Sequence, residues 1–111
     1  MASKAANKEA LEIRWHGRGG QGAISSAQIL AQAAYDAGYM GVTSAPTFGA
    51  ERRGAPVSAS NRLSPTPIRT FSQIQHPAVV IVLDDTLLSV ANATQGLEPG
   101  GWLIEIGRAH V

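Results

Sequence analysis

The feature that most constrains the fold is a strand-like run that breaks into glycines and continues into a helical pattern, between Leu11 and Gly38. Residues 11–16 carry apolar side chains at alternate positions, which predicts a strand with two unlike faces. Residues 23–37 repeat apolar or small side chains with the period of a helix that buries one face. Gly38 is expected to close this helix, because the closing position usually adopts the left-handed conformation that glycine tolerates. Strand, tight turn and helix in this order predict an α/β fold with a Rossmann-like first βαβ unit.

The glycine turn between these elements fits the pattern G-x-G-x-x-G and consists of Gly17, Arg18, Gly19, Gly20, Gln21 and Gly22. Such a turn lets the backbone approach a ligand, and the helix N-terminus that follows offers N–H groups to an anion. A second interpretation is that the glycines only allow a sharp turn and close packing of the helix on the sheet. His16, at the end of the strand, is either a donor to the same anion or a residue with structural hydrogen bonds only.

A dinucleotide site would need an acidic residue roughly 20 positions further on, at the end of the second strand, to bind the ribose hydroxyls. That strand is expected at residues 39–43, and Val42 is followed by Thr-Ser-Ala-Pro at 43–46, without an acid. The nearest acid, Asp36, lies inside the preceding helix. The sequence therefore disfavours NAD or FAD as a ligand.

Composition excludes several classes of function. The 111 residues contain no cysteine, so this chain holds no disulfide framework, thiolate zinc site or iron–sulfur cluster. A net charge of +1 gives no reason to expect nucleic acid or an anionic membrane as a partner, and no apolar run reaches the roughly 18 residues of a membrane span. Neither a nucleophile elbow with triad partners nor a metal-ligand spacing occurs. We predict one small cytoplasmic domain without catalytic residues or a metal of its own.

A long loop is expected over residues 44–57, which contain two prolines and two glycines and no apolar period. Loops of this length without secondary structure are usually functional or disordered. This loop carries Glu51, Arg52 and Arg53. The two arginines are candidates for gripping a phosphate or a partner's carboxylate, because guanidinium groups bind both in a bidentate manner. The alternative is a solvated cluster of charges.

The rest of the chain predicts further strands. Residues 57–63 and 68–71 alternate in polarity around a proline-rich turn, which predicts an antiparallel hairpin on the edge of the sheet. The β-branched run 78–83 predicts a central parallel strand covered on both faces, and residues 102–104 open another buried strand. The expected architecture is thus a three-layer α/β fold with a mostly parallel sheet.

Two acids and two chain ends complete the pattern. Asp84 and Asp85 follow the central strand, where they would meet a ligand or cap a helix over residues 87–91.

Residues 1–10 are expected to form a disordered leader. Residues 105–111 lack the capping residues expected before a further helix, and they can be back-translated into the opening of a common sequencing adapter. We therefore expect one C-terminally truncated domain over residues 11–104, followed by a non-native tail.

Four linked motifs carry a resemblance to a known family. In their order along the chain they are His-Gly-Arg-Gly-Gly-Gln-Gly at 16–22, Phe-Gly-Ala-Glu-Arg-Arg-Gly-Ala-Pro-Val at 48–57, Pro-Ile-Arg at 67–69 with Ser-Gln-Ile at 72–74, and Val-Ile-Val-Leu-Asp-Asp-Thr-Leu-Leu at 80–88. Together they resemble the gamma subunit, or gamma domain, of the 2-oxoacid:ferredoxin oxidoreductases. The second and third motifs are more similar to the pyruvate type than to the 2-oxoglutarate type, and the aryl and branched-chain enzymes are similar as well.

The resemblance implies a multisubunit enzyme that decarboxylates a 2-oxoacid on thiamine diphosphate, passes electrons through iron–sulfur clusters to ferredoxin and releases an acyl-CoA. Thiamine diphosphate, Mg²⁺ and the clusters would belong to thiamine-binding and ferredoxin-like partner subunits. This chain would complete the assembly and line the entry of CoA, with the six residues of the glycine turn, Arg52 and Arg53 as candidate contacts. Two other readings stay open, an autonomous nucleotide-binding oxidoreductase domain and a non-catalytic α/β interaction module.

Overall fold

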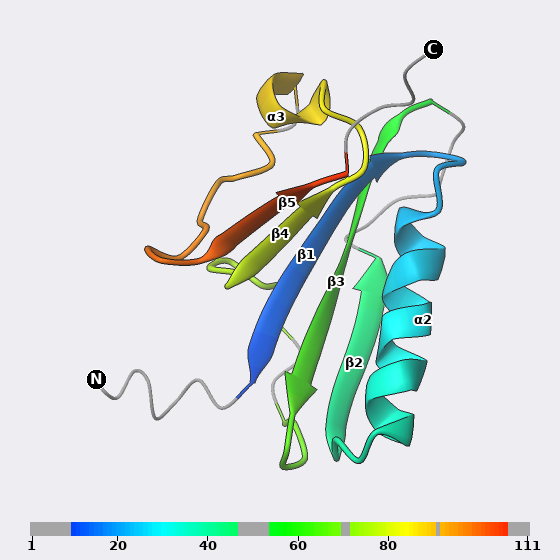
Figure 1. Ribbon diagram of the computed structural model, residues 1–111, viewed down its shortest axis with the longest axis vertical. Coiled ribbons are helices and arrows are strands. Elements are labelled where there is room, and N and C mark those ends of the chain that lie inside the picture. The colour runs from blue at the N-terminus through cyan, green and yellow to red at the C-terminus, as the bar shows by residue number, and fades with distance from the viewer. Residues whose placement is uncertain (1–9, 47–53, 70–71, 91, 107–111) are drawn as a thin grey trace.

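The computed structural model describes residues 10–46, 54–69, 72–90 and 92–106 as an α/β unit built on one five-stranded sheet (Figure 1). A long helix packs on one face of the sheet, and a one-turn helix lies near the end of the fourth strand. The elements in chain order are β1 (Leu11–Arg18), α2 (Ala23–Asp36), β2 (Gly41–Pro46), β3 (Pro56–Ser64), β4 (Val79–Val82), α3 (Leu87–Val90) and β5 (Trp102–Glu105).

The strand order is β2-β3-β1-β4-β5. β4 pairs in parallel with both β1 and β5, whereas β3 pairs antiparallel with both β1 and β2. Four strands therefore run in one direction and only β3 runs against them. The predicted α/β class is confirmed. The sheet is mixed, with two parallel and two antiparallel strand pairs, and the antiparallel strand lies inside the sheet rather than on its edge.

The predicted edge hairpin is wrong for the same reason. Both edges of β3 are already occupied by β1 and β2, so no edge is left for a partner strand at 68–71. Residues 68 and 69 are not in a strand, and residues 70 and 71 lie outside the described part of the chain. After β3 the chain turns instead, with the backbone N–H of Thr66 donating to Ser64 Oγ at 3.1 Å.

The first βαβ unit also differs from a Rossmann unit. β2 begins at Gly41 and continues through Pro46, so the loop expected over 44–57 shortens to the residues between β2 and β3. β2 runs parallel to β1 but is not its neighbour, because β3 lies between them. The helix between these two strands is as expected: it ends at Asp36, and Gly38 just beyond has φ +108°.

α2 covers the face of the sheet formed by β1, β3 and β2. Ile13, Ala34 and Leu63 form its buried core, with Trp15 and Leu30 packed against them. One polar side chain is fully buried in this layer, Asn61 of β3. Its Oδ1 accepts a hydrogen bond from the Trp15 indole at 2.8 Å, and its Nδ2 donates to Ala27 O at 2.9 Å and Thr43 O at 3.0 Å. The amide thus joins β1, β2, β3 and α2 at one point.

The opposite face is apolar over β4. Val80 and Val82 are fully buried there against Leu87 of α3 and Ala93. The prediction that the run 78–83 forms a central parallel strand is confirmed, since β4 lies between two parallel neighbours. With α2 on one face and α3 on the other, helices occupy both sides of the sheet.

β5 is a strand as predicted, but it is not buried. Trp102 is 70% exposed, and Leu103 and Ile104 are 42% and 44% exposed. β5 forms the edge of the sheet beyond β4, and nothing in the described part of the chain covers it. Residues 1–9 and 107–111, on which most of the leader and tail predictions fall, lie outside the described residues. In the part that is described, no helix has the length and apolar character needed to cross a membrane.

Candidate functional site

The glycine turn begins with the last two residues of β1, Gly17 and Arg18, and leads into α2. Gly20 and Gly22 have φ of +93° and +92°, a conformation that favours glycine. Gly17 serves close packing, because a Cβ at this position would lie 3.2 Å from both Ala23 Cβ and Leu83 Cδ1. The turn therefore needs glycine for its backbone shape and for helix packing. No side chain caps the first turn of α2, whose N-cap residue is Gly22.

Arg18 and Gln21 of the turn converge on Asp84, at the carboxyl end of β4. Arg18 Nε lies 3.4 Å from Asp84 Oδ2, and Gln21 Nε2 donates to the same oxygen at 3.2 Å. Arg18 also donates to Thr86 Oγ1 at 2.8 Å. Asp84 Oδ1 accepts from the backbone N–H and hydroxyl of Thr86, and these hydrogen bonds are the main cause of the lowered pKa of Asp84. Asp84 thus both orders the start of α3 and anchors the glycine turn.

The turn is also paired with the end of the loop between β2 and β3. Gly19 N donates to Ala55 O at 2.8 Å, Gly54 N donates to Gly19 O at 3.1 Å, and Arg18 Nη1 donates to Gly54 O at 3.0 Å. Arg52 and Arg53 directly precede Gly54 in sequence but lie outside the described residues. The structure therefore places Gly54, the residue after these arginines, beside the glycine turn. The contacts of Arg52 and Arg53 themselves stay a prediction.

His16 is not at the end of its strand, because β1 continues to Arg18. Its side chain lies on the face opposite α2 and is 8% exposed. His16 Nε2 accepts a hydrogen bond from Arg14 Nε at 3.1 Å. Desolvation, followed by the neighbouring Arg14 charge, lowers the pKa of His16 to about 4, so the ring is neutral at pH 7. The side-chain hydrogen bond of His16 within the described residues is thus to Arg14, two residues earlier on the same strand.

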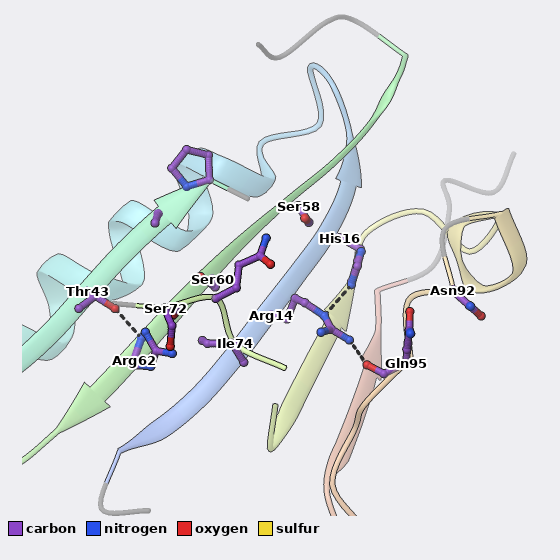
Figure 2. A pocket seen from close by; sticks show the side chains of 13 residues that line it. Arg14, His16, Thr43, Ser58, Ser60, Arg62, Ser72, Ile74, Asn92 and Gln95 are labelled. Carbon is purple, nitrogen blue, oxygen red and sulfur yellow. Dashed lines mark hydrogen bonds between the residues drawn. The ribbon is translucent and has the colours of Figure 1, made fainter. Parts of the chain in front are cut away.

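A second polar site lies on this opposite face of the sheet, in a cavity of about 580 Å³ that we call the sheet-face pocket. Figure 2 shows Arg14 and His16 of β1 beside Ser58, Ser60 and Arg62 of β3. Arg62 Nε donates to Glu12 Oε2 at 2.9 Å and Arg62 Nη2 to Ser72 O at 2.7 Å, which holds the segment after β3 against the sheet. On this face β1 and β3 therefore carry polar side chains, unlike the neighbouring β4.

Sequence reasoning missed this pocket, although a signal was present. Glu12, Arg14 and His16 share one parity in β1, and Ser58, Ser60 and Arg62 share one parity in β3. When two strands that each carry polar residues on one face and, Asn61 apart, apolar or small residues on the other become neighbours, they form a polar surface. The sequence patterns did not establish that β1 and β3 pair.

The arrangement argues against a dinucleotide site. A ribose-binding acid would stand at the end of a second strand next to β1, and β3 occupies that place. Asp36 stays in α2, where its Oδ1 accepts from Gln32 Nε2 at 3.0 Å. Within the described residues there is also no group of three or more histidine, cysteine, aspartate or glutamate side chains suited to a metal ion.

The chain matches a known family along most of its length. The model of the pyruvate ferredoxin/flavodoxin oxidoreductase family matches residues 12–105. Over 94 residues the chain is 53% identical to the pyruvate/ketoisovalerate oxidoreductases common subunit gamma of Thermococcus litoralis, covering 85% of this chain and 50% of that protein. Over 97 residues it is 50% identical to the pyruvate synthase subunit PorC of Thermotoga maritima, covering 87% and 50%. The chain thus spans about half the length of these relatives.

Solved structures show the same similarity. The crystal structure of the pyruvate oxidoreductase subunit PORC from Thermotoga maritima superposes with a TM-score of 0.73 at 46% identity, covering 88% of this chain and 50% of that one. The 2-oxoglutarate:ferredoxin oxidoreductase from Magnetococcus marinus, solved with 2-oxoglutarate, coenzyme A and succinyl-CoA bound, superposes with a TM-score of 0.67 at 26% identity. That match covers 94% of this chain and 18% of the larger one.

Proposed function

Because this chain belongs to the pyruvate ferredoxin/flavodoxin oxidoreductase family, as its four linked motifs predicted, we propose that it acts as a gamma-type subunit of a multisubunit 2-oxoacid:ferredoxin oxidoreductase. The observation that carries the proposal is the 53% identity over 94 residues to a gamma subunit. The assembled enzyme would oxidatively decarboxylate a 2-oxoacid, transfer the acyl group to CoA and pass the electrons to ferredoxin. It would work in the cytoplasm, with this chain not catalytic on its own.

Pyruvate or a related branched-chain 2-oxoacid is the proposed substrate. Relatives near 50% identity have names that refer to pyruvate or ketoisovalerate, whereas the 2-oxoglutarate enzyme is only 26% identical. The iron–sulfur clusters are assigned to a partner subunit, because this chain contains no cysteine to ligate iron. Thiamine diphosphate and Mg²⁺ are assigned to a partner as well, because this sequence has no Gly-Asp-Gly motif with a downstream asparagine to hold them. The partners are a thiamine-binding subunit and a ferredoxin-like subunit.

Within the assembly we assign the glycine turn and its paired loop to the CoA side of the enzyme. The first turn of α2 lacks a side-chain cap, and helix N-termini attract phosphate groups. Gly54, the residue that follows Arg52 and Arg53 in sequence, is hydrogen-bonded to Gly19 of this turn. Their guanidinium groups would bind the phosphates of CoA or a carboxylate of a neighbouring subunit.

The test is a double substitution, Arg52→Ala with Arg53→Ala, in the assembled full-length enzyme. Each charge-assisted hydrogen bond contributes roughly 1.5 to 3 kcal/mol, so the Michaelis constant for CoA should rise at least tenfold if the arginines bind CoA. If they hold an interface, the gamma subunit should instead dissociate, which subunit stoichiometry detects. Arg69→Ala is the matched control, because Arg69 is an exposed arginine of a different segment, the one that follows β3.

Two further results decide between this proposal and an interaction module. Omitting the chain from co-expression should abolish 2-oxoacid-dependent reduction of ferredoxin, and adding it back should restore the activity. If the remaining subunits assemble and turn over at full rate without it, the chain is not part of the enzyme. If the double arginine variant shows unchanged assembly, CoA dependence and turnover, Arg52 and Arg53 form only a solvated charge cluster, which is the alternative interpretation of this loop.

A further inference from the structure

Arg14 of β1 is a half-buried cation whose described partners are all neutral. Its Nε donates to His16 Nε2 at 3.1 Å, and its Nη2 donates to the backbone oxygen of Gln95 (Figure 2). Nη2 also donates to the backbone oxygen of Ala93 at 3.3 Å. No carboxylate among the described residues pairs with it. Desolvation by burial lowers the pKa of Arg14. A guanidinium in this position is costly to bury unless an anion completes its surroundings.

The other described residues that line the sheet-face pocket supply no negative charge to balance Arg14. Arg62 also lines it, but Arg62 is compensated by Glu12, which lies 2.9 Å away. None of the described residues that line the pocket is acidic. The excess positive charge in the pocket is therefore the charge of Arg14.

Other donors stand around this charge. The hydroxyls of Ser58 and Ser60 come from the neighbouring strand β3, at positions paired with His16 and Arg14 in the antiparallel register. Arg14 Nη1 carries two N–H groups that form no hydrogen bond with the described residues. A carboxylate or phosphate accepts hydrogen bonds from both kinds of donor, and an arginine fork presents two of them side by side.

We propose that the sheet-face pocket binds an oxyanion, the carboxylate or phosphate group of a small molecule, with Arg14 as its counter-charge and the Ser60 hydroxyl as a second donor. The volume of about 580 Å³ lies within the roughly 300–1,000 Å³ of small-molecule sites, so the ligand is larger than the anionic group alone. This site is distinct from the glycine turn, none of whose six residues is among the described residues that line the pocket and whose Arg18 is paired with Asp84.

The experiment is equilibrium dialysis of the assembled complex against radiolabelled inorganic phosphate and, separately, radiolabelled acetate at low ionic strength. The wild-type complex should bind one more equivalent of one probe per chain than the Arg14→Gln complex. Arg14→Lys should keep this binding but weaken it roughly tenfold, because the charge remains while the fork is lost. The preferred probe identifies the anionic group as a phosphate or a carboxylate.

Two controls keep the result decisive. Arg69→Gln removes an exposed arginine outside the pocket and should leave anion binding unchanged. Ser60→Ala leaves every described hydrogen bond of Arg14 in place and should weaken binding a few fold, which tests the site even if Arg14→Gln disturbs the segment at Gln95. Subunit stoichiometry and circular dichroism verify that each variant is folded and assembled.

Three outcomes would overturn the proposal: no anion bound by the wild type, equal binding by the wild type and Arg14→Gln, or binding insensitive to Ser60→Ala when Arg14→Gln fails to fold. Glu51→Gln tests whether a carboxylate of the chain itself occupies the pocket, since Glu51 belongs to the loop outside the described residues. Anion binding that occurs only in Glu51→Gln would show that a carboxylate of the chain fills the pocket, and the small-molecule site would then be wrong.

Discussion

Replacing Asn61 by alanine should destabilise the centre of the sheet more than any surface substitution. The side chain is fully buried and makes three hydrogen bonds, to the Trp15 indole, to Ala27 O of α2 and to Thr43 O of β2. Alanine removes all three and leaves the indole N–H and the Thr43 carbonyl without these partners in the layer under α2. The variant should therefore loosen three strands and the helix at once.

The magnitude follows from the count of lost partners. A buried donor or acceptor left unsatisfied costs about 1 to 3 kcal/mol, and the cavity left by the amide adds to this cost. We expect Asn61→Ala to lower the free energy of unfolding by about 3 to 5 kcal/mol, against a total of about 5 to 15 kcal/mol for a typical domain. Asn61→Asp should be no milder, since a carboxylate would face the two carbonyl oxygens that the amide now binds.

Hydrogen exchange measured by mass spectrometry on the assembled complex is the suitable assay, because it reports the local opening of β3 without requiring the chain alone. At about 1.4 kcal/mol per factor of ten, protected amides of β3 should exchange faster by roughly two to three and a half powers of ten. Gln32→Ala is the control, because it removes only the exposed hydrogen bond to Asp36, worth a few tenths of a kcal/mol. An acceleration in Asn61→Ala of less than about tenfold would refute the reasoning.

Three other predictions concern pH, solubility and cofactor binding. The pKa of His16 is lowered to about 4 in the folded chain, so between about pH 6.5 and 4 the unfolded chain binds more protons than the folded one. As the pH falls through this range, the free energy of unfolding should therefore decrease by roughly 3 kcal/mol. Urea titrations of the complex at several pH values should show this slope reduced in His16→Gln but not in His76→Gln, whose parent side chain is exposed; equal slopes would contradict it. Expressed alone, the chain should be poorly soluble or oligomeric, because β5 exposes Trp102 on an open sheet edge, and co-expression with partner subunits should rescue it; a sharp monomeric peak with cooperative melting argues otherwise. Calorimetry should detect no useful binding of NAD or NADP, and micromolar affinity would revive the nucleotide-binding alternative.

Local patterns predicted the elements of the fold well and their arrangement less well. Strand, glycine turn and helix at the start, and the apolar strand β4, follow from periodicities that each segment carries within itself. Which strands pair is decided by contacts between distant segments. The insertion of β3 between β1 and β2 depends on partners such as Asn61 and Trp15, which are 46 residues apart in sequence.

Burial and the candidate sites were predicted unevenly. The apolar run at β5 reads as buried, yet burial needs a covering element, and the described part of the chain supplies none. The glycine turn could be located because its pattern is contiguous, whereas its anchor Asp84 lies in a different segment and was only one of two acids to consider. The sheet-face pocket could not be located, because it requires β1 and β3 to be neighbours.

The position of β3 also has a consequence for how the chain acquires its structure during synthesis. β1 and β2 are complete once Pro46 has emerged from the ribosome, yet neither pairs with the other, and both have β3 as a neighbour. No ladder of this sheet can therefore form until residues 56–64 have left the exit tunnel. While residues 47–64 are being synthesised, the nascent chain therefore contains α2 and two strands that are not yet paired. Because pairing of β2 with β3 closes a shorter loop than pairing of β1 with β3, we expect the β2–β3 pair to form first and β1 to join it afterwards.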